Sequence, residues 1–288
     1  MSHSRKYGRN GKTFHVPFSP GTDSTDRKNW DFWSNIVDGV LQGQYVEDKV
    51  FHNVLPQPPI ERLVLTEKLD GSGTCFNEFG LFGRSHGAPS ENPWDRNMRQ
   101  KWGLIKNDLK ELGLEIFGEN MYAVHSIEYL KLEHDFYSFA IRKDDEWLSW
   151  EEVEYWSELF DFPTVPVIER DINAMQRWGS QEACQKDIEN ICSNASYFGS
   201  IDFQTKEYCS MEGVVFRNQN NYHVNNFVQN VFKWVRKDHV KTDAHWTSLW
   251  RPAYKKHELE SVYGHSEMTE EDYRQGIITL ETKNRKNG

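Results

Sequence analysis

The stretch Glu67-Lys68-Leu69-Asp70-Gly71-Ser72-Gly73 is the most informative part of the sequence for both fold and site. It follows a short β-prone run at residues 63–66, so a lysine leaves a strand and meets two glycines within five residues. Because glycine lets the main chain approach a ligand closely, this turn can bring an amine and backbone amides to a phosphate. A salt-bridged surface lysine in a glycine turn is the alternative for these residues taken alone.

A nucleophilic role for Lys68 makes a demand on its surroundings. An amine attacks only when it is neutral, so the pKa of Lys68 is expected to be lowered by burial, a metal or a second lysine. Lys233 is the candidate neighbour, within the later stretch Phe232-Lys233-Trp234-Val235-Arg236-Lys237. Together with Lys241, this stretch predicts a local basic patch even though the formal net charge of the chain is -10.

Two short segments at strand ends offer groups for a sugar or a phosphate. Gly83-Arg84-Ser85-His86-Gly87 presents the guanidinium of Arg84, which suits ribose or phosphate oxygens. Phe117-Gly118-Glu119-Asn120 ends a hydrophobic strand with a carboxylate that can accept hydrogen bonds from ribose hydroxyls. Taken alone, the first also fits an ordinary surface turn and the second a strand-end glutamate in solvent.

Two further segments offer an aromatic ring and a metal ligand. In residues 135–141, strand alternation places Phe139 on the face opposite Ser138 and Ala140, where a ring can stack on a purine. A core role for this ring is the alternative. Glu212 opens the buried strand predicted at residues 213–217 and can hold a divalent metal.

Apolar patterning and turn residues predict short strands interrupted by helices. The clearest helix is expected to begin with Asn92 as its N-cap and Pro93 at its first helical position, and to end at Gly113. A second helix opens at Ser149, where Glu152 completes a capping box. Further helices are expected over residues 181–193 and after a cap at Thr269. Strands are expected at residues 63–66, 73–76, 80–84, 114–118, 136–142, 213–217 and 231–235, the second and third forming a hairpin.

The composition is that of a folded protein. Of the 288 residues, 37% are hydrophobic and 14% aromatic, which is ample for a core. No run approaches the ~18 apolar residues of a membrane span, and residues 1–11 are basic and polar without a secretion signal behind them. The four cysteines lack C-x-x-C spacing and fit free thiols in a reducing cytosol. We therefore expect a soluble, unsecreted protein with no membrane contact.

In chain order, these segments resemble the nucleotidyltransferase motifs shared by ATP-dependent ligases and mRNA capping enzymes. The resemblance spans about residues 63–246, most of the chain. Within that superfamily the chain is most similar to nick-sealing RNA ligases of the phage and kinetoplastid RNA-editing type, and residues 15–22 and 239–246 also look like phage-type members. The matching stretches are residues 68–71 for motif I (Lys-x-Asp-Gly), 117–119 for motif III, 136–141 for motif IIIa, 212–215 for motif IV and 232–237 for motif V.

The resemblance implies catalytic roles for Lys68, Glu212 and Lys233. Lys68 would form a lysyl-AMP phosphoramidate, and Lys233 would contact the α-phosphate. Glu212, with Asp70, would hold Mg²⁺ or Mn²⁺. The residues implied to bind the ATP nucleotide are Glu67, Arg84, Glu119 at the ribose, Phe139 on the adenine, Lys233, and Arg236 or Lys237 at the leaving pyrophosphate.

One position departs from the family pattern. Motif V often reads Lys-x-Lys, whereas Val235 stands two residues after Lys233 here, and the next basic residues are Arg236 and Lys237. The second basic role of motif V is therefore unassigned by the sequence.

The implied reaction joins RNA 5′-phosphate and 3′-hydroxyl ends in three in-line phosphoryl transfers. The RNA is a nick in a duplex, a break in a tRNA, a single strand or an RNA–DNA hybrid; the sequence does not choose among them. A monomer is expected, in the cytoplasm, or in the host cytoplasm for a phage-encoded chain. The alternatives are a DNA ligase, a capping guanylyltransferase and a non-catalytic nucleotide- or RNA-binding module.

The implied fold class is α+β, an antiparallel-rich nucleotidyltransferase (ATP-grasp-like ligase) domain with AMP held between sheets. Residues 1–60 are expected to form an N-terminal arm or lobe packed on the core, and residues 61–246 the nucleotidyltransferase domain. Residues 247–288 are expected to be a small helical C-terminal extension, too short for the OB-fold domain that DNA ligases and capping enzymes append.

Overall fold

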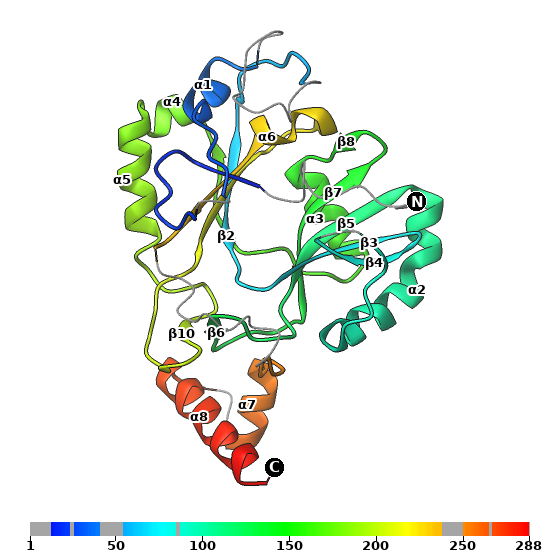
Figure 1. The fold of residues 1–288 in the computed structure, drawn as a ribbon, viewed down its shortest axis with the longest axis vertical. Coiled ribbons are helices and arrows are strands. Elements are labelled where there is room, and N and C mark those ends of the chain that lie inside the picture. Colours follow the sequence, from blue (N-terminus) through cyan, green and yellow to red (C-terminus); the bar gives the residue numbers. More distant parts are fainter. Residues whose placement is uncertain are drawn as a thin grey trace.

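The computed structural model describes residues 13–23, 26–40, 54–84, 87–237, 250–264 and 267–287. They form a mixed α+β fold in which two larger sheets are flanked by helices (Figure 1). Nearly all strand pairs are antiparallel, so the predicted fold class is confirmed. The predicted boundary at residues 246 and 247 and the resemblance over residues 239–246 lie outside the described residues, and the domain division stays a prediction.

The first sheet carries the end of the strand that delivers Lys68. Lys68 pairs with Gly213 on the neighbouring strand, so Glu212 lies beside the lysine. The strand order is β1 (Phe14–His15), β13 (Val231–Val235), β11 (Gly213–Asn218), β2 (Leu63–Lys68) and β9 (Val167–Ile172). β1 and β13 run parallel, which adds the N-terminal segment to the sheet edge.

The second sheet is antiparallel throughout. Its strand order is β12 (Tyr222–His223), β8 (Glu146–Trp147), β7 (Phe136–Lys143), β5 (Leu114–Asn120), β3 (Ser72–Asn77) and β4 (Gly80–Gly83). The predicted hairpin is present: Asn77 pairs with Gly80, and the backbone N–H of Phe79 donates to the Asn77 side chain. A small separate pair joins β6 (Ile127–Tyr129) to β10 (Ser200–Asp202).

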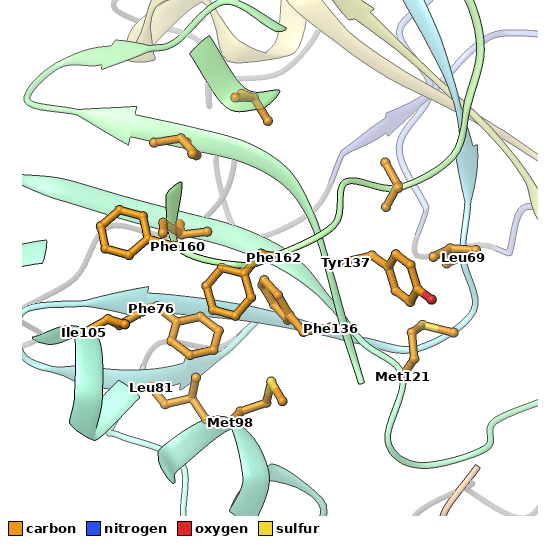
Figure 2. Close-up of a cluster of buried hydrophobic side chains, with 14 of the residues drawn as sticks. Leu69, Phe76, Leu81, Met98, Ile105, Met121, Phe136, Tyr137, Phe160 and Phe162 are labelled. Carbon is orange, nitrogen blue, oxygen red and sulfur yellow. The ribbon is translucent and has the colours of Figure 1, made fainter. Parts of the chain in front are cut away.

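Helices cover the outer face of each sheet. α1 (Phe32–Val37), α4 (Ala174–Arg177) and α5 (Gln181–Ile191) pack on the first sheet. α2 (Arg96–Leu112) and α3 (Trp150–Leu159) pack on the second through a cluster that includes Phe76, Met98 and Phe136 (Figure 2). A third apolar cluster lies between the sheets, where Phe117 and Ala140 meet Val215 and residues of α6 (Phe227–Asn230), which follows a short 3₁₀ turn at Val224–Asn226.

The helix boundaries test the sequence predictions individually. Ser149 and Glu152 form the predicted capping box of α3, and α2 ends at Gly113 in the left-handed conformation. The prediction that Asn92 caps α2 is wrong. A 3₁₀ turn at Pro93–Asp95 comes first, and the Asn92 side chain donates to Ser90 and Asp95 instead of capping.

The C-terminal helices α7 (Lys256–Tyr263) and α8 (Glu270–Asn287) lie together at one end of the molecule, beside β6 and β10 (Figure 1). Thr269 and Asp272 exchange backbone and side-chain hydrogen bonds at the start of α8, as the cap prediction requires. In the described part of the chain, no helix combines the length and apolar character needed to cross a bilayer.

Candidate active site

A pocket lies between the two sheets at the end where β2 delivers Lys68. The first sheet contributes side chains from β2, β11 and β13, and the second contributes β3, β5 and β7. The lining residues are Thr13, Glu67, Lys68, Leu69, Gly71, Gly73, Thr74, Arg84, Phe117, Glu119, Phe139, Val165, Val215, Arg217 and Lys233. Six of the residues predicted from the sequence therefore meet in one place: Glu67, Lys68, Arg84, Glu119, Phe139 and Lys233.

Lys68 is held by an acidic partner. Its Nζ donates to Oε2 of Glu212 at 2.8 Å, and the two side chains are 25% and 6% exposed. The pairing of Lys68 with Gly213 explains this contact, because Glu212 immediately precedes Gly213. The amine thus faces the pocket while it is tied to the start of β11.

The electrostatics around Lys68 differ from the expectation. Burial alone lowers the pKa of an amine, but the carboxylates of Glu212 and Glu119 outweigh it and raise the pKa of Lys68 above its usual value. The pKa of Lys68 is therefore shifted in the direction opposite to the expectation. Lys233 lines the same pocket, yet Glu212 is the group in direct contact with the amine.

Glu119 lies opposite Lys68, near the end of β5. Burial, together with repulsion from Glu212, raises its pKa to about 7 in spite of the nearby lysine. Gly71 packs closely here: a Cβ at that position would lie 2.9 Å from Cγ of Glu119 and 2.7 Å from the carbonyl oxygen of Asn120. The glycine is thus required by close approach of the turn to β5.

Phe139 enters the pocket through an irregularity in β7. The register skips one residue, because Phe117 pairs with Ala140 while Gly118 pairs with Ser138. A β-bulge of this kind redirects a side chain, and Phe139 lies partly exposed in the pocket. The guanidinium of Arg217 lies over its ring at 5.1 Å, and Arg217 Nε donates to Thr66 Oγ1 at 3.4 Å.

Arg217 is the functional candidate that sequence reasoning missed. It stands at the end of the predicted strand 213–217 and received no role there. A signal existed, because an arginine inside an apolar strand is costly to bury unless a partner or ligand offsets its charge. Its residue is only 7% exposed.

Glu67 turns away from its neighbour. Strand alternation sends the side chains of Glu67 and Lys68 to opposite faces of β2. Oε2 of Glu67 accepts from the backbone N–H of Tyr197 at 3.0 Å, while its buried Oε1 has no hydrogen-bond partner among the described residues. Burial raises the pKa of Glu67 to about 7. Its carboxyl group therefore secures the loop at residues 196–198.

Asp70 is engaged beside the pocket and does not line it. Its Oδ2 accepts from the backbone N–H groups of Ser126 and Ile127 at 2.8 and 2.9 Å. Arg236 and Lys237 also lie outside the pocket lining; Arg236 is half-buried and Lys237 exposed. Ser85, His86 and Lys241 fall outside the described residues.

The donor groups at the pocket fit a divalent cation held together with a phosphate. Glu212 and Glu119 both act on the Lys68 amine, and Glu212 adds to the effect of burial in raising the pKa of Glu119. Mg²⁺ is commonly held by one or two carboxylates plus substrate phosphates. Within the described ranges, no three Asp, Glu, His or Cys side chains gather into a self-sufficient metal site.

The two-sheet α+β fold, with a lysine, carboxylates and an aromatic ring between the sheets, agrees with the nucleotidyltransferase class that the motifs predict. Comparison with protein families identifies the family. The model of the RNA ligase family matches residues 61–235. The chain belongs to the RNA ligase family. Among curated proteins, none matches it.

Solved structures give distant likenesses. One is a variant of Naegleria gruberi RNA ligase with ATP and Mn, at 20% identity and a TM-score of 0.43, covering 62% of this chain and 50% of that one. Another is an apo variant of the same ligase, at 16% identity and a TM-score of 0.44, covering 81% and 61%. The chain thus spans about half to three-fifths of the length of these proteins.

Proposed function

We propose that the protein is an ATP-dependent RNA ligase that carries AMP on Lys68 and joins a 5′-phosphate to a 3′-hydroxyl. Family membership supports this proposal. The observation that carries it is the position of the Lys68 amine, at the end of a strand and in a pocket that also holds a stacking ring and carboxylates. Basic groups from three other segments, Arg84, Arg217 and Lys233, line the same pocket.

The nucleotide lies between the sheets in this proposal. Phe139 stacks on the adenine, and Arg217, which contacts the Phe139 ring, lies at the same end of the pocket. Glu119 accepts from the ribose hydroxyls. Arg84 and Lys233 contact phosphate oxygens. The side chain of Glu67 is occupied by Tyr197, so its main chain is the part that remains for the base.

In the first step, Nζ of Lys68 attacks the α-phosphorus of ATP, the bond to the β-phosphate oxygen breaks, and pyrophosphate leaves. The amine must first give up its hydrogen bond to Glu212, and the two protons that it loses pass to solvent. Glu212, with Asp70, would hold a divalent cation, which would supply positive charge against the phosphates and against the carboxylates that keep the lysine protonated.

The two later steps use the same pocket. An oxygen of the RNA 5′-phosphate attacks the AMP phosphorus, the N–P bond breaks, and Lys68 takes its protons back. The RNA 3′-hydroxyl then attacks the activated 5′-phosphate, loses its proton, and displaces AMP. Positioning and charge neutralisation do most of the work in such transfers, and Arg84 and Lys233 are the side chains assigned to it. Pyrophosphate contacts by Arg236 or Lys237 stay predictions.

Attachment of a labelled nucleotide tests the first step. The purified protein is incubated with Mg²⁺ and α-labelled ATP or GTP and separated under denaturing conditions. We expect a labelled band from ATP, lost in Lys68→Ala. Lys101→Ala is a matched control, since Lys101 is also 25% exposed and paired with a carboxylate, 3.3 Å from Asp161. Label from GTP would indicate a capping enzyme, and no label from protein free of bound AMP would refute the covalent mechanism.

Sealing assays test the substrate. Nicked duplexes are prepared with RNA or DNA on the strand that supplies the 3′-hydroxyl and on the strand that supplies the 5′-phosphate. RNA at the joined ends is expected to be sealed faster than DNA. Equal sealing of an all-DNA nick would favour the DNA ligase alternative, which shares the lysine chemistry.

A further inference from the structure

β6 holds the turn that follows the nucleophile. The Asp70 carboxylate accepts from the N–H groups of Ser126 and Ile127, and the backbone N–H of Asp70 donates to the hydroxyl of Tyr129 at 2.8 Å. Three hydrogen bonds to residues 126–129 therefore hold Asp70, which stands two residues after Lys68. The position of this short strand sets where the Lys68 turn can lie.

Glu128 stands between these residues and faces the other way. It is 1% exposed, and its Oε2 accepts from Lys206 Nζ at 2.7 Å while its Oε1 accepts from Arg251. Both cations also bind Oε1 of Glu281 on α8, Lys206 at 2.7 Å. The result is a closed ring of alternating charges: Glu128, Lys206, Glu281 and Arg251.

The rest of the C-terminal segment fastens to the same stretch of chain. The backbone N–H of Val124 donates to Arg251, and that of Ala253 donates to Tyr122. Leu130, immediately after β6, packs with Leu259 of α7 and with residues of α8 such as Ile277. Residues 122–130 are thus held on one side by the C-terminal helices and bind Asp70 on the other.

We infer that the C-terminal helix α8 positions the Lys68 turn through β6, with Glu128 as the positioning residue that joins the two. This inference rests on the proposed function for its catalytic consequence. Glu128 touches neither the pocket nor the reacting groups, so it acts through Asp70. The ring suits this role because each charged side chain contacts two side chains of opposite charge. These contacts restrict the movement of β6, which carries Glu128.

The two cations at the ring keep Glu281 ionised. Lys206 and Arg251 outweigh the effect of burial and lower the pKa of Glu281. Replacing it with glutamine therefore removes a full charge while nearly preserving shape. Glu128→Ala would instead empty a buried position between two cations and is expected to damage folding, so Glu281→Gln is the better test.

Hydrogen exchange in the full-length chain measures whether α8 affects β6 and the Lys68 turn, and it does not require enzymatic activity. We expect Glu281→Gln to speed exchange of the amides at residues 126–127 and 70 by about 3- to 10-fold, because their hydrogen bonds depend on the position of β6. Glu271→Gln is the control on the same helix; it weakens the ion pair with Arg274 and the hydrogen bond donated by the Tyr208 hydroxyl, and neither is a side-chain contact of the ring. Unchanged exchange in Glu281→Gln would overturn the inference.

Nucleotide labelling reads the catalytic consequence. At saturating ATP, Glu281→Gln should attach AMP about 3- to 10-fold more slowly, while the ATP concentration for half-maximal rate stays that of wild type, because Phe139 and Arg217 do not contact the ring. Faster exchange with an unchanged labelling rate would overturn the positioning role. A wild-type protein that never labels would instead refute the proposed function, and the exchange comparison would still decide whether α8 holds the turn.

Discussion

Substituting Gly71 by alanine tests whether the turn after Lys68 packs too closely against β5 to accept a side chain. A Cβ at this position would lie 2.6 Å from Sδ of Met121, 2.7 Å from the carbonyl oxygen of Asn120 and 2.9 Å from Cγ of Glu119. The methionine can move, because its sulfur is the far part of a flexible side chain. The Asn120 carbonyl cannot move freely, since it belongs to a strand paired with Ser72.

The geometry sets the size of the effect. Ordinary van der Waals contact begins at 3.4 Å, so the turn and the end of β5 must separate by about 0.7 Å. Inserting a methyl group into a tightly packed site costs about 1–3 kcal/mol of unfolding free energy. Because Glu119 lies at the contact, and a misplacement near 1 Å can cost about 100-fold in rate, we expect AMP attachment to slow about 10- to 100-fold.

Gly103→Ala supplies the control, at an exposed position of α2 outside the pocket lining. A Cβ there meets no heavy atom within 4 Å, so this variant should keep wild-type labelling and stability within about 1 kcal/mol. Both variants are compared by urea unfolding and by the rate of labelling with α-labelled ATP. If Gly71→Ala matched Gly103→Ala in both measurements, close packing of the turn against β5 would not explain the glycine at position 71.

Three further outcomes are expected. The pKa of Glu67 is raised from 4.5 to about 7, so between these pH values the folded state holds a proton that the unfolded chain releases, and the unfolding free energy falls as pH rises. In denaturant titrations, Glu67→Gln should flatten this fall and raise the unfolding free energy at pH 8 by up to roughly 3 kcal/mol. Phe139→Leu should raise the ATP concentration for half-maximal labelling about 10-fold, whereas Phe79→Leu, a change at an exposed hairpin residue, should not. Chelation of divalent metal should stop labelling and added Mg²⁺ or Mn²⁺ should restore it; full labelling in excess chelator would remove the metal from the scheme.

Local patterns predicted much of the fold because they have local causes. The capping box at Ser149, the glycine end of α2 and the hairpin after Asn77 each depend on a few neighbouring residues. The Asn92 cap failed because the competing interaction was equally local: Asn92 donates to Ser90 and Asp95, and Pro93 opens a 3₁₀ turn. Strand order, in contrast, depends on contacts distant in sequence, and no local pattern could show that β1 joins β13.

The candidate site also combines features that the local sequence predicts with features that depend on distant contacts. Residues with distinctive chemistry at strand ends, such as Lys68, Glu119 and Lys233, could be picked out before their meeting place was known. Arg217 could not be assigned a role, because its contact with Phe139 arises only when β11 and β7 face each other across the pocket. A bulge in β7 helps to create that contact, and the sequence 135–141 reads as plain alternation.

The sheet order also explains why Glu212, and not Lys233, is the group in direct contact with Lys68. A basic partner on β13 is plausible in sequence, but β11 lies between β13 and β2, so the strand adjacent to Lys68 is the one that Glu212 precedes. The amine therefore rests as a cation bound to a carboxylate, with its pKa raised. A lysine in that state is a poor nucleophile until positive charge competes for Glu212. Attack by Lys68 therefore requires release of its hydrogen bond to Glu212. Glu212→Gln should alter the pH dependence of labelling as well as its metal dependence.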